Sequence, residues 1–254
     1  MPLEKPYPHV ARGQTFPANF ICNEQEARVL ISAFFILKRD LIKVFEYIEP
    51  TSDNLGTYSH RTLEILLRSC IEVEGLAKIV FTKNHIHLPK SDRNIIRYSD
   101  LNGLMRLSEY EVALPGYQIP NMRPFSAFSE TSREKRSPFW YKEYNKAKHD
   151  RLGALRHASL GVTLEAMAGA YVLLSAQIGI NFDSQARMAG SGSNALEVDG
   201  ETFNLGFITM SDSYDLFEIV NSPVWSPEEK YGFKPEELPE DDSKYNLAPI
   251  PKIP

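Results

Sequence analysis

The chain has 254 residues and a formal net charge of −5, with 43% hydrophobic and 24% charged residues. This balance is typical of a globular protein, and the negative charge argues against nonspecific coating of nucleic acid. Cys22 and Cys70 are the only cysteines and lack metal-site spacing, so we expect a reduced, cytoplasmic protein. Residues 1–22 contain no apolar secretory stretch and should form an extended arm.

Two long helices are predicted after this arm. The first begins at a capping box formed by Asn23 and Glu26 and ends at the Glu49–Pro50 stop, and the second spans residues 59–83. The linking sequence TSDNLGTYSH is rich in turn formers and permits an antiparallel return. The apolar stripe expected to bury the first helix comprises Val29, Leu30, Ala33, Phe34, Leu37, Leu41, Val44, Phe45 and Ile48.

Charged residues follow one face of the second helix. Glu64, Arg68 and Glu72 are four residues apart, and Glu74 and Lys78 form a further pair at this spacing. Such a ladder is routine on a solvated helix face. The alternative is that Arg68 or Glu72 faces a later helix that carries a histidine, where a carboxylate would raise the pKa of the imidazole.

The sequence does not indicate a metal site or a cofactor. His85 and His87 have no carboxylate or cysteine nearby with ligand-like spacing, so we interpret them as loop residues. No predicted helix offers carboxylate and histidine in paired fashion at i,i+3 or i,i+4. A metal-dependent enzyme is therefore the least favoured interpretation.

Helical sequence resumes at Ser91 and is predicted to break near Gly103. An irregular stretch over residues 108–137 follows, and long loops of this kind are usually functional or disordered. It ends in a basic cluster of Arg133, Lys135 and Arg136. This loop could close over a neighbouring site or bind phosphate.

The segment from Ser137 to Arg151, SPFWYKEYNKAKHDR, is the strongest candidate for a functional site. Ser137 suits a helix cap and Pro138 suits the first helical position, so a helix should begin there. The helical wheel predicts an aromatic face that docks on the protein and a polar face that stays available. The first comprises Trp140, Tyr144 and Ala147, and the second comprises Lys142, Asn145 and His149.

The string WYKEYNKAKHDR resembles the motif helix of the HEPN superfamily (higher eukaryotes and prokaryotes nucleotide-binding). These are all-α proteins common among bacterial RNases, toxins and phage-defence factors. Their signature is arginine, a polar residue that is often asparagine, three variable residues and histidine. Asn145 and His149 have this spacing, but Tyr144 stands in the arginine position. The resemblance covers roughly residues 24 to 180 in helix order, and its specific part is the quoted string.

The resemblance implies an antiparallel helical bundle and a homodimer whose site is built from both chains. It gives His149 the role of general acid or base, with Asn145 orienting the phosphate or the imidazole. The positive charge that the family arginine supplies would have to come from neighbouring side chains. The candidate substrate-binding residues are Lys146, Lys148, Arg151, Tyr144 and Arg68.

Two classes of function follow. The first is an RNA- or nucleotide-associated protein, such as a degenerate RNase of a defence or toxin type, with weak or absent cleavage because of Tyr144. The second is a non-catalytic helical dimerisation or scaffold module. In that case His149 is a helix-end histidine satisfied by the helix dipole.

Residues 159–180, SLGVTLEAMAGAYVLLSAQIGI, are apolar on almost all sides, with Ser159 as a plausible cap. A membrane span is the alternative, because the run is nearly long enough and Glu165 is its only charge. Small and polar residues dilute its hydropathy, and no positive flank follows. We therefore expect a central buried helix and no membrane partner.

The composition changes after Asn181. Asp199 and Gly200 mark the two-residue turn of a hairpin, and the later segment YDLFEIV fits either a strand or a helix. From Ser222 on, prolines and acidic residues predict an extended, poorly packed tail. The overall prediction is a mainly α protein with an arm over residues 1–22, a helical domain over 23–180, and a hairpin with an acidic, proline-rich tail over 181–254.

Overall fold

The structure is a computed structural model that describes residues 9–12, 24–150, 152–179, 196–198, 201–203 and 216–225. The described part is mainly helical with small antiparallel sheets, which confirms the mainly α fold with a β-hairpin. The helices are α2 (Glu24–Phe45), α3 (His60–Lys83), α4 (Ile95–Tyr98), α5 (Asn102–Met105), α6 (Phe139–His149) and α7 (Leu160–Ile178). The strands are β1 (Glu111–Ala113), β2 (Leu196–Val198), β3 (Glu201–Phe203) and β4 (Glu218–Asn221).

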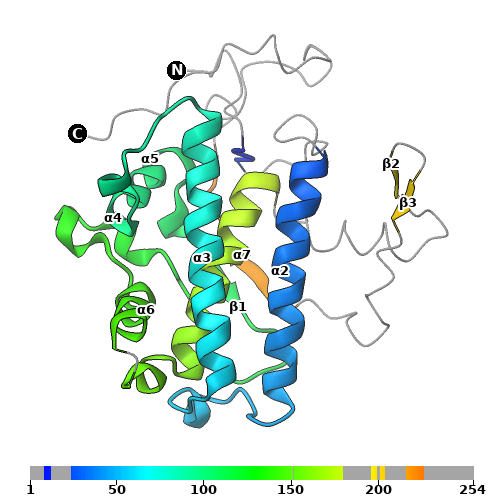
Figure 1. Ribbon diagram of the computed structural model, residues 1–254, viewed down its shortest axis with the longest axis vertical. Helices are drawn as coiled ribbons and strands as arrows, with labels where there is room; N and C mark the ends of the chain where they lie inside the picture. The colour runs from blue at the N-terminus through cyan, green and yellow to red at the C-terminus, as the bar shows by residue number, and fades with distance from the viewer. Residues whose placement is uncertain are drawn as a thin grey trace.

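α2 and α3 lie side by side as the predicted antiparallel pair (Figure 1). α3 begins at a capping box in which Ser59 Oγ accepts the Thr62 N–H at 3.1 Å and Thr62 Oγ1 accepts the Ser59 N–H at 2.8 Å. This reciprocal bonding satisfies donors that a helix start otherwise leaves unpaired. The predicted start of the second helix is confirmed.

α2 begins at Glu24, directly after the predicted cap Asn23, which itself lies outside the described residues. The helix ends at Phe45, before the predicted stop at Glu49. Glu26, the other residue of the predicted capping box, forms an ion pair with Lys83 of α3. Val29 is 63% exposed, so the predicted apolar stripe is correct for its central residues and wrong at this position.

α7 is the central helix, and it packs against α3, α2 and α6. Ser159 Oγ accepts the Val162 N–H at 3.4 Å, which confirms the predicted cap. Two buried polar side chains of α7 donate to carbonyls of α3: Thr163 to Thr62 at 3.2 Å and Gln177 to Leu76 at 3.3 Å. These bonds fix the alignment of the two helices because buried polar groups must find partners.

Among the described residues, α7 is the one helix long and apolar enough to cross a membrane. However, 89% of its apolar window is buried inside the protein. Because a core helix meets the same criteria, the match is weak evidence for a span. The burial agrees with the predicted central position of this segment.

Both chain ends contribute residues to the core. β4 pairs antiparallel with β1, and Ile219 lies opposite Val112. The segment YDLFEIV, which fits either a strand or a helix by sequence, therefore ends in a strand. Phe217, just before β4, is 1% exposed, and its ring centroid lies 5.6 Å from that of Tyr171 on α7. In the predicted N-terminal arm, His9 is also buried, with Nδ1 3.2 Å from Gln177 Oε1. The tail beyond residue 225 lies outside the described residues.

The helical sequence predicted from Ser91 forms two short helices, and a 3₁₀ turn at Ser99–Leu101 separates α4 from α5. The break therefore comes shortly before the predicted position at Gly103. α5 ends at Met105, and its C-cap Arg106 has a left-handed φ of 51°. The following irregular stretch contains β1 and covers one side of α6 and α7.

Candidate functional site on α6

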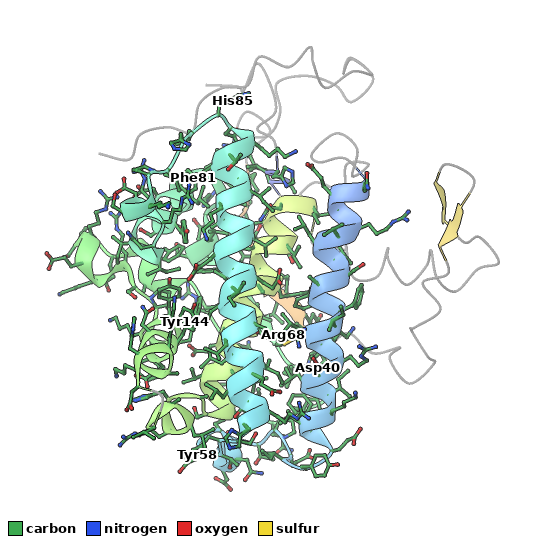
Figure 2. All side chains as sticks on the ribbon, in the orientation of Figure 1. Asp40, Tyr58, Arg68, Phe81, His85 and Tyr144 are labelled. Carbon is green, nitrogen blue, oxygen red and sulfur yellow. The ribbon has the colours of Figure 1, made fainter. Side chains whose placement is uncertain are left out.

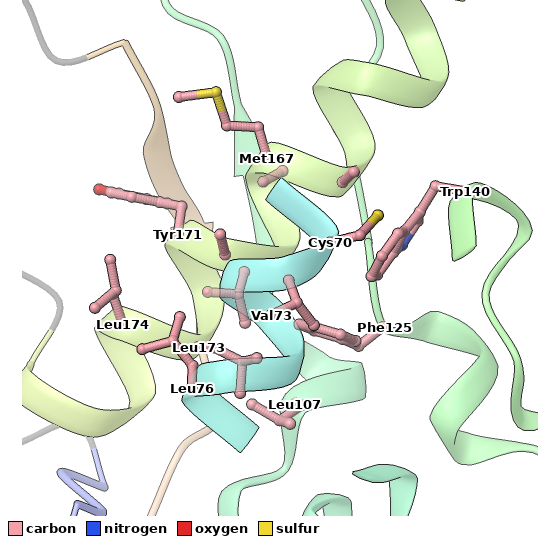
Figure 3. Close-up of a cluster of buried hydrophobic side chains, with 14 of the residues drawn as sticks. Cys70, Val73, Leu76, Leu107, Phe125, Trp140, Met167, Tyr171, Leu173 and Leu174 are labelled. Atoms are coloured by element: carbon pink, nitrogen blue, oxygen red, sulfur yellow. The ribbon is translucent and has the colours of Figure 1, made fainter. Parts of the chain in front are cut away.

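The aromatic face of α6 docks into the core as predicted. Trp140 is fully buried, and its Nε1–H donates to the Pro124 carbonyl at 2.8 Å. Its ring meets Phe125 edge-on at 6.0 Å between centroids (Figure 3). Gly169 of α7 permits this approach, since a Cβ there would lie 3.3 Å from Trp140 Cζ2. These contacts hold α6 in a fixed orientation.

The start of α6 differs from its prediction. The helix begins at Phe139 with Pro138 in the capping position, and no side chain caps it. The predicted roles of Ser137 as cap and Pro138 as first helical residue are therefore wrong by one residue. Phe139 itself is 63% exposed, which leaves an aromatic ring on the surface beside the polar face.

Two tyrosines of α6 lean towards α3. The Tyr141 hydroxyl donates to Glu74 Oε1 at 2.8 Å, and the Tyr144 ring lies 5.3 Å from the Tyr141 ring. Tyr144 is 3% exposed, and burial, with the charge of Glu74, raises the pKa of its phenol to about 12. Its burial argues against the direct substrate contact predicted for it.

The outer face of α6 carries the polar residues expected there. Lys142 and His149 are exposed and Asn145 is half-buried. In the part of the chain that the structure describes, none of these three side chains makes a hydrogen bond or an ion pair. The Lys148 ammonium lies 5.5 Å from the centroid of the Tyr144 ring, a cation–π contact that leaves its charge uncompensated. The face therefore presents cations, an amide and an imidazole to solvent.

Glu143 connects α6 to the 3₁₀ turn Ala154–His157. Its side chain is 10% exposed; Oε1 accepts from Lys146 Nζ at 2.6 Å and Oε2 lies 2.7 Å from His157 Nδ1. Burial raises the pKa of this carboxyl, but the hydrogen bonds from Lys146 and His157 outweigh it and hold the pKa below its usual value. Glu143 therefore orients the imidazole and engages Lys146, one of the predicted substrate-binding residues.

His157 is the residue that sequence reasoning misses. The signal for it is Glu143, which the helical wheel places on the docked side of α6 beside Trp140 and Ala147. A carboxylate on a buried face needs a hydrogen-bonding partner. The wheel cannot identify that partner, because His157 lies beyond the end of the helix.

The chain turns back directly after α6. Asp150 Oδ1 accepts the Gly153 N–H at 2.9 Å, and its other oxygen lies 3.7 Å from Arg156 Nη2. This exposed pair brings one more cation to the end of α6. Arg151, a predicted substrate-binding residue, lies outside the described residues.

Arg68 does not belong to the α6 surface. Its Nη1 donates to Asp40 of α2, and Figure 2 shows this pair on the opposite side of α3 from Tyr144. The interpretation that Arg68 faces the helix carrying His149 is therefore wrong. Glu64 pairs with Arg61 at 2.7 Å, so the expected Glu64–Arg68 contact does not form either.

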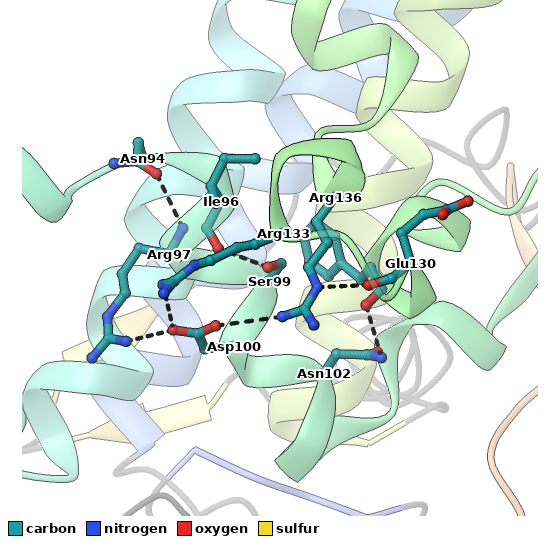
Figure 4. Close-up of polar contacts among 10 residues, drawn as sticks. Asn94, Ile96, Arg97, Ser99, Asp100, Asn102, Glu130, Arg133 and Arg136 are labelled. Atoms are coloured by element: carbon teal, nitrogen blue, oxygen red, sulfur yellow. Dashed lines mark hydrogen bonds and ion pairs between the residues drawn. The ribbon is translucent and has the colours of Figure 1, made fainter. Parts of the chain in front are cut away.

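The two arginines of the basic cluster before α6 bind carboxylate and carbonyl groups of the protein itself. Arg133 and Arg136 meet Asp100 at 3.1 and 3.8 Å, and Arg97 contacts the same carboxylate (Figure 4). Arg136 Nε also donates to the Glu130 carbonyl at 2.8 Å. These contacts anchor the loop before α6 to the α4–α5 region rather than closing it over the α6 surface.

Within the described ranges, no group of three or more histidine, cysteine and acidic residues is placed to hold a metal ion. Cys70 is free and buried beside the aromatic side of α6 (Figure 3). Comparisons of the chain with protein-family models, curated proteins and solved structures find no match. The HEPN resemblance therefore rests on the sequence of α6 itself.

Proposed function

We propose that this protein binds RNA or nucleotides through the exposed face of α6 and the turn after it, as a HEPN-like protein with weak or absent RNase activity. The observation that carries the proposal is the concentration of positive charge around this helix. Residues 139–157, which form α6 and the turn after it, contain five lysines and arginines and two acidic residues, in a chain whose net charge is −5. Such local basic patches supply most of the affinity for phosphate backbones.

The exposed side chains suit recognition of a single strand. Lys142 and Lys148 have no carboxylate partner in the described part of the chain, so their charges remain for phosphates. Asn145 and His149 add hydrogen-bonding groups on the side of Lys142, whereas Lys148 lies nearer the Tyr144 ring. The exposed ring of Phe139 offers a surface on which a base can stack.

The same geometry argues for weak or absent cleavage. Phosphodiester cleavage needs fixed positive charge at the phosphorus as well as an acid or base. Tyr144 stands where the resembled family has arginine, and it is buried. Lys146 is already bound to Glu143, so Lys148, Arg151 or the partner chain would have to supply the charge.

We also propose that the protein is a homodimer with the two α6 helices close together, because the resemblance implies a site shared between chains. Sedimentation velocity at micromolar concentration should give the mass of a dimer. A monomer would contradict this arrangement and would leave each α6 surface to act alone.

Retention and cleavage of a labelled RNA pool test the proposed function together. Wild type and His149→Ala should both retain RNA, and neither should cleave it efficiently. Efficient cleavage by wild type that disappears in His149→Ala would overturn the proposal of weak or absent RNase activity. If wild type neither retains nor cleaves RNA, the non-catalytic scaffold becomes the better account.

A further inference from the structure

A separate cavity lies at the C-terminal end of α3. It has a volume of about 410 Å³, within the range of small-molecule sites. Figure 2 shows His85 and Phe81 at this end of the helix, well apart from Tyr144 on α6. The lining residues are Lys78, Phe81, Thr82, His85, Ile86, His87, Leu88 and Arg93.

All ionisable side chains that line this cavity are basic. Lys78 and Arg93 carry permanent charge, and His85 and His87 add charge when protonated. The larger cavity beside Arg68, of about 530 Å³, has three carboxylates among its lining residues. The ionisable groups that line the cavity at the end of α3 are therefore of one sign and suit an anion, whereas those of the larger cavity are of both signs.

The two permanent cations reach the cavity from different elements. Arg93 follows the 3₁₀ turn Lys90–Asp92, and its Nε donates to the Leu88 carbonyl at 3.1 Å. This bond orients the guanidinium, and its terminal nitrogens make no hydrogen bond or ion pair within the described residues. Lys78 lies 3.5 Å from Glu74 Oε2, a long ion pair with a carboxylate that also accepts from Tyr141.

The loop after α3 places its two histidines at the rim. His85 has a left-handed φ of 58°, which is uncommon for a residue other than glycine. After it, exposure alternates: His85 and His87 are exposed, Ile86 is half-buried and Leu88 is buried. The cavity therefore has an imidazole rim and an apolar wall.

We infer that this cavity binds a small phosphate monoester, with the phosphoryl group held by Lys78 and Arg93 and the organic part against Ile86 and Leu88. A phosphate monoester carries a charge of about −1.5 to −2 and three strong acceptor oxygens at neutral pH. That charge matches two fixed cations supported by two histidines better than the single charge of a carboxylate does. The inference is independent of RNA binding, because the two surfaces share no residue.

Isothermal titration calorimetry of the full chain tests the ligand class with simple probes. Phenyl phosphate should bind saturably at one site per chain, more tightly than inorganic phosphate and phenylacetate, and phenol should not bind. No saturable binding of phenyl phosphate would overturn the inference. Equal binding of phenol would overturn the role of the cations, and tighter binding of phenylacetate would overturn the assignment to phosphate.

Matched substitutions test the location. Lys78→Gln and Arg93→Gln should each weaken phenyl phosphate binding by about tenfold, because each removes a charge-assisted hydrogen bond. Lys90→Gln removes a nearby exposed charge outside the lining and should leave the affinity unchanged. The inference fails if both cavity variants bind like wild type, or if Lys90→Gln weakens binding as much as they do. Circular dichroism melts verify that each variant is folded.

The histidines provide a second readout of location. The protein has six histidines, and phenyl phosphate should shift the imidazole NMR signals of His85 and His87. Shifts confined to His149 and His157 would place the ligand on α6 and contradict the inference. Lys142→Glu separates the two proposals: it should weaken RNA retention and leave phenyl phosphate binding intact.

Discussion

Glu143 is a nearly buried carboxylate whose charge holds both Lys146 and His157. Glu143→Gln preserves its size and removes the charge, so we expect the free energy of unfolding at neutral pH to fall by about 1–3 kcal/mol. Urea denaturation measures this change. Glu134→Gln is the matched control, because Glu134 is exposed and unpaired among the described residues, and it should change stability by less than about 0.5 kcal/mol.

The contribution of Glu143 should depend on pH in one direction. Its folded-state pKa lies below the ordinary value of 4.5, so the unfolded chain binds the proton more readily than the folded one does. The stabilisation is then complete above that ordinary value and is lost as the pH falls through the folded pKa. The stability difference between wild type and Glu143→Gln should shrink in acid, and a constant difference down to about pH 3 would contradict this linkage.

Two helix glycines should respond oppositely to alanine. Gly75 of α3 has nothing within 4 Å of an added Cβ, so Gly75→Ala should stabilise by about 0.5–1 kcal/mol through helix propensity. At Gly169 of α7 the Cβ would meet the rings of Trp140 and Phe125 at 3.3 and 3.4 Å. Both rings are buried, so we expect overpacking to outweigh the propensity gain, and Gly169→Ala should destabilise by about 1 kcal/mol. Thermal melts that shift the same way in both variants would contradict this packing.

At the scale of helices, periodicity predicts which face is buried but not which neighbour covers it. The wheel of α6 gave the correct docked and exposed faces, because Trp140 and the tyrosines recur at helical spacing. On α3 the same reasoning left Arg68 open between a solvated helix face and a contact with the helix that carries His149. The choice depends on Asp40, a partner in another helix that no local pattern identifies. The position of Phe139 as the first residue of α6 was missed because helix boundaries depend on local cap geometry.

In the whole molecule, Phe217 joins the C-terminal segment to the helical core. Phe217→Ala should lower the free energy of unfolding by about 3–5 kcal/mol, because the ring is buried against Tyr171 and Phe34. Val220→Ala on the adjoining strand β4 is the control, since Val220 is 47% exposed and its truncation should have little effect. Equal stability losses in the two variants, measured by urea denaturation, would show that the Phe217 ring does not anchor this segment.

Contacts between residues that are far apart in the chain could not be predicted from the sequence. The run YDLFEIV is too short to separate strand from helix by periodicity, and its partner β1 lies in the irregular stretch before α6. The contact between Glu143 and His157 likewise depends on how the chain turns after α6. The long helices could be predicted because the apolar residues of each recur at helical spacing. Strand partners and side-chain partners depend on the assembled fold.

The salt dependence of RNA binding tests the proposed function most directly. Fluorescence anisotropy with a labelled single-stranded RNA compares wild type, the double variant Lys142→Glu with Lys148→Glu, and Lys43→Glu on α2 as a charge-reversal control away from α6. If both lysines contact phosphates, the double variant should bind at least about tenfold more weakly, and the slope of log K against log salt should decrease in magnitude by about 1.4. Lys43→Glu should retain the wild-type affinity and slope. Unchanged affinity and slope in the double variant, or an equal loss in Lys43→Glu, would contradict binding through α6.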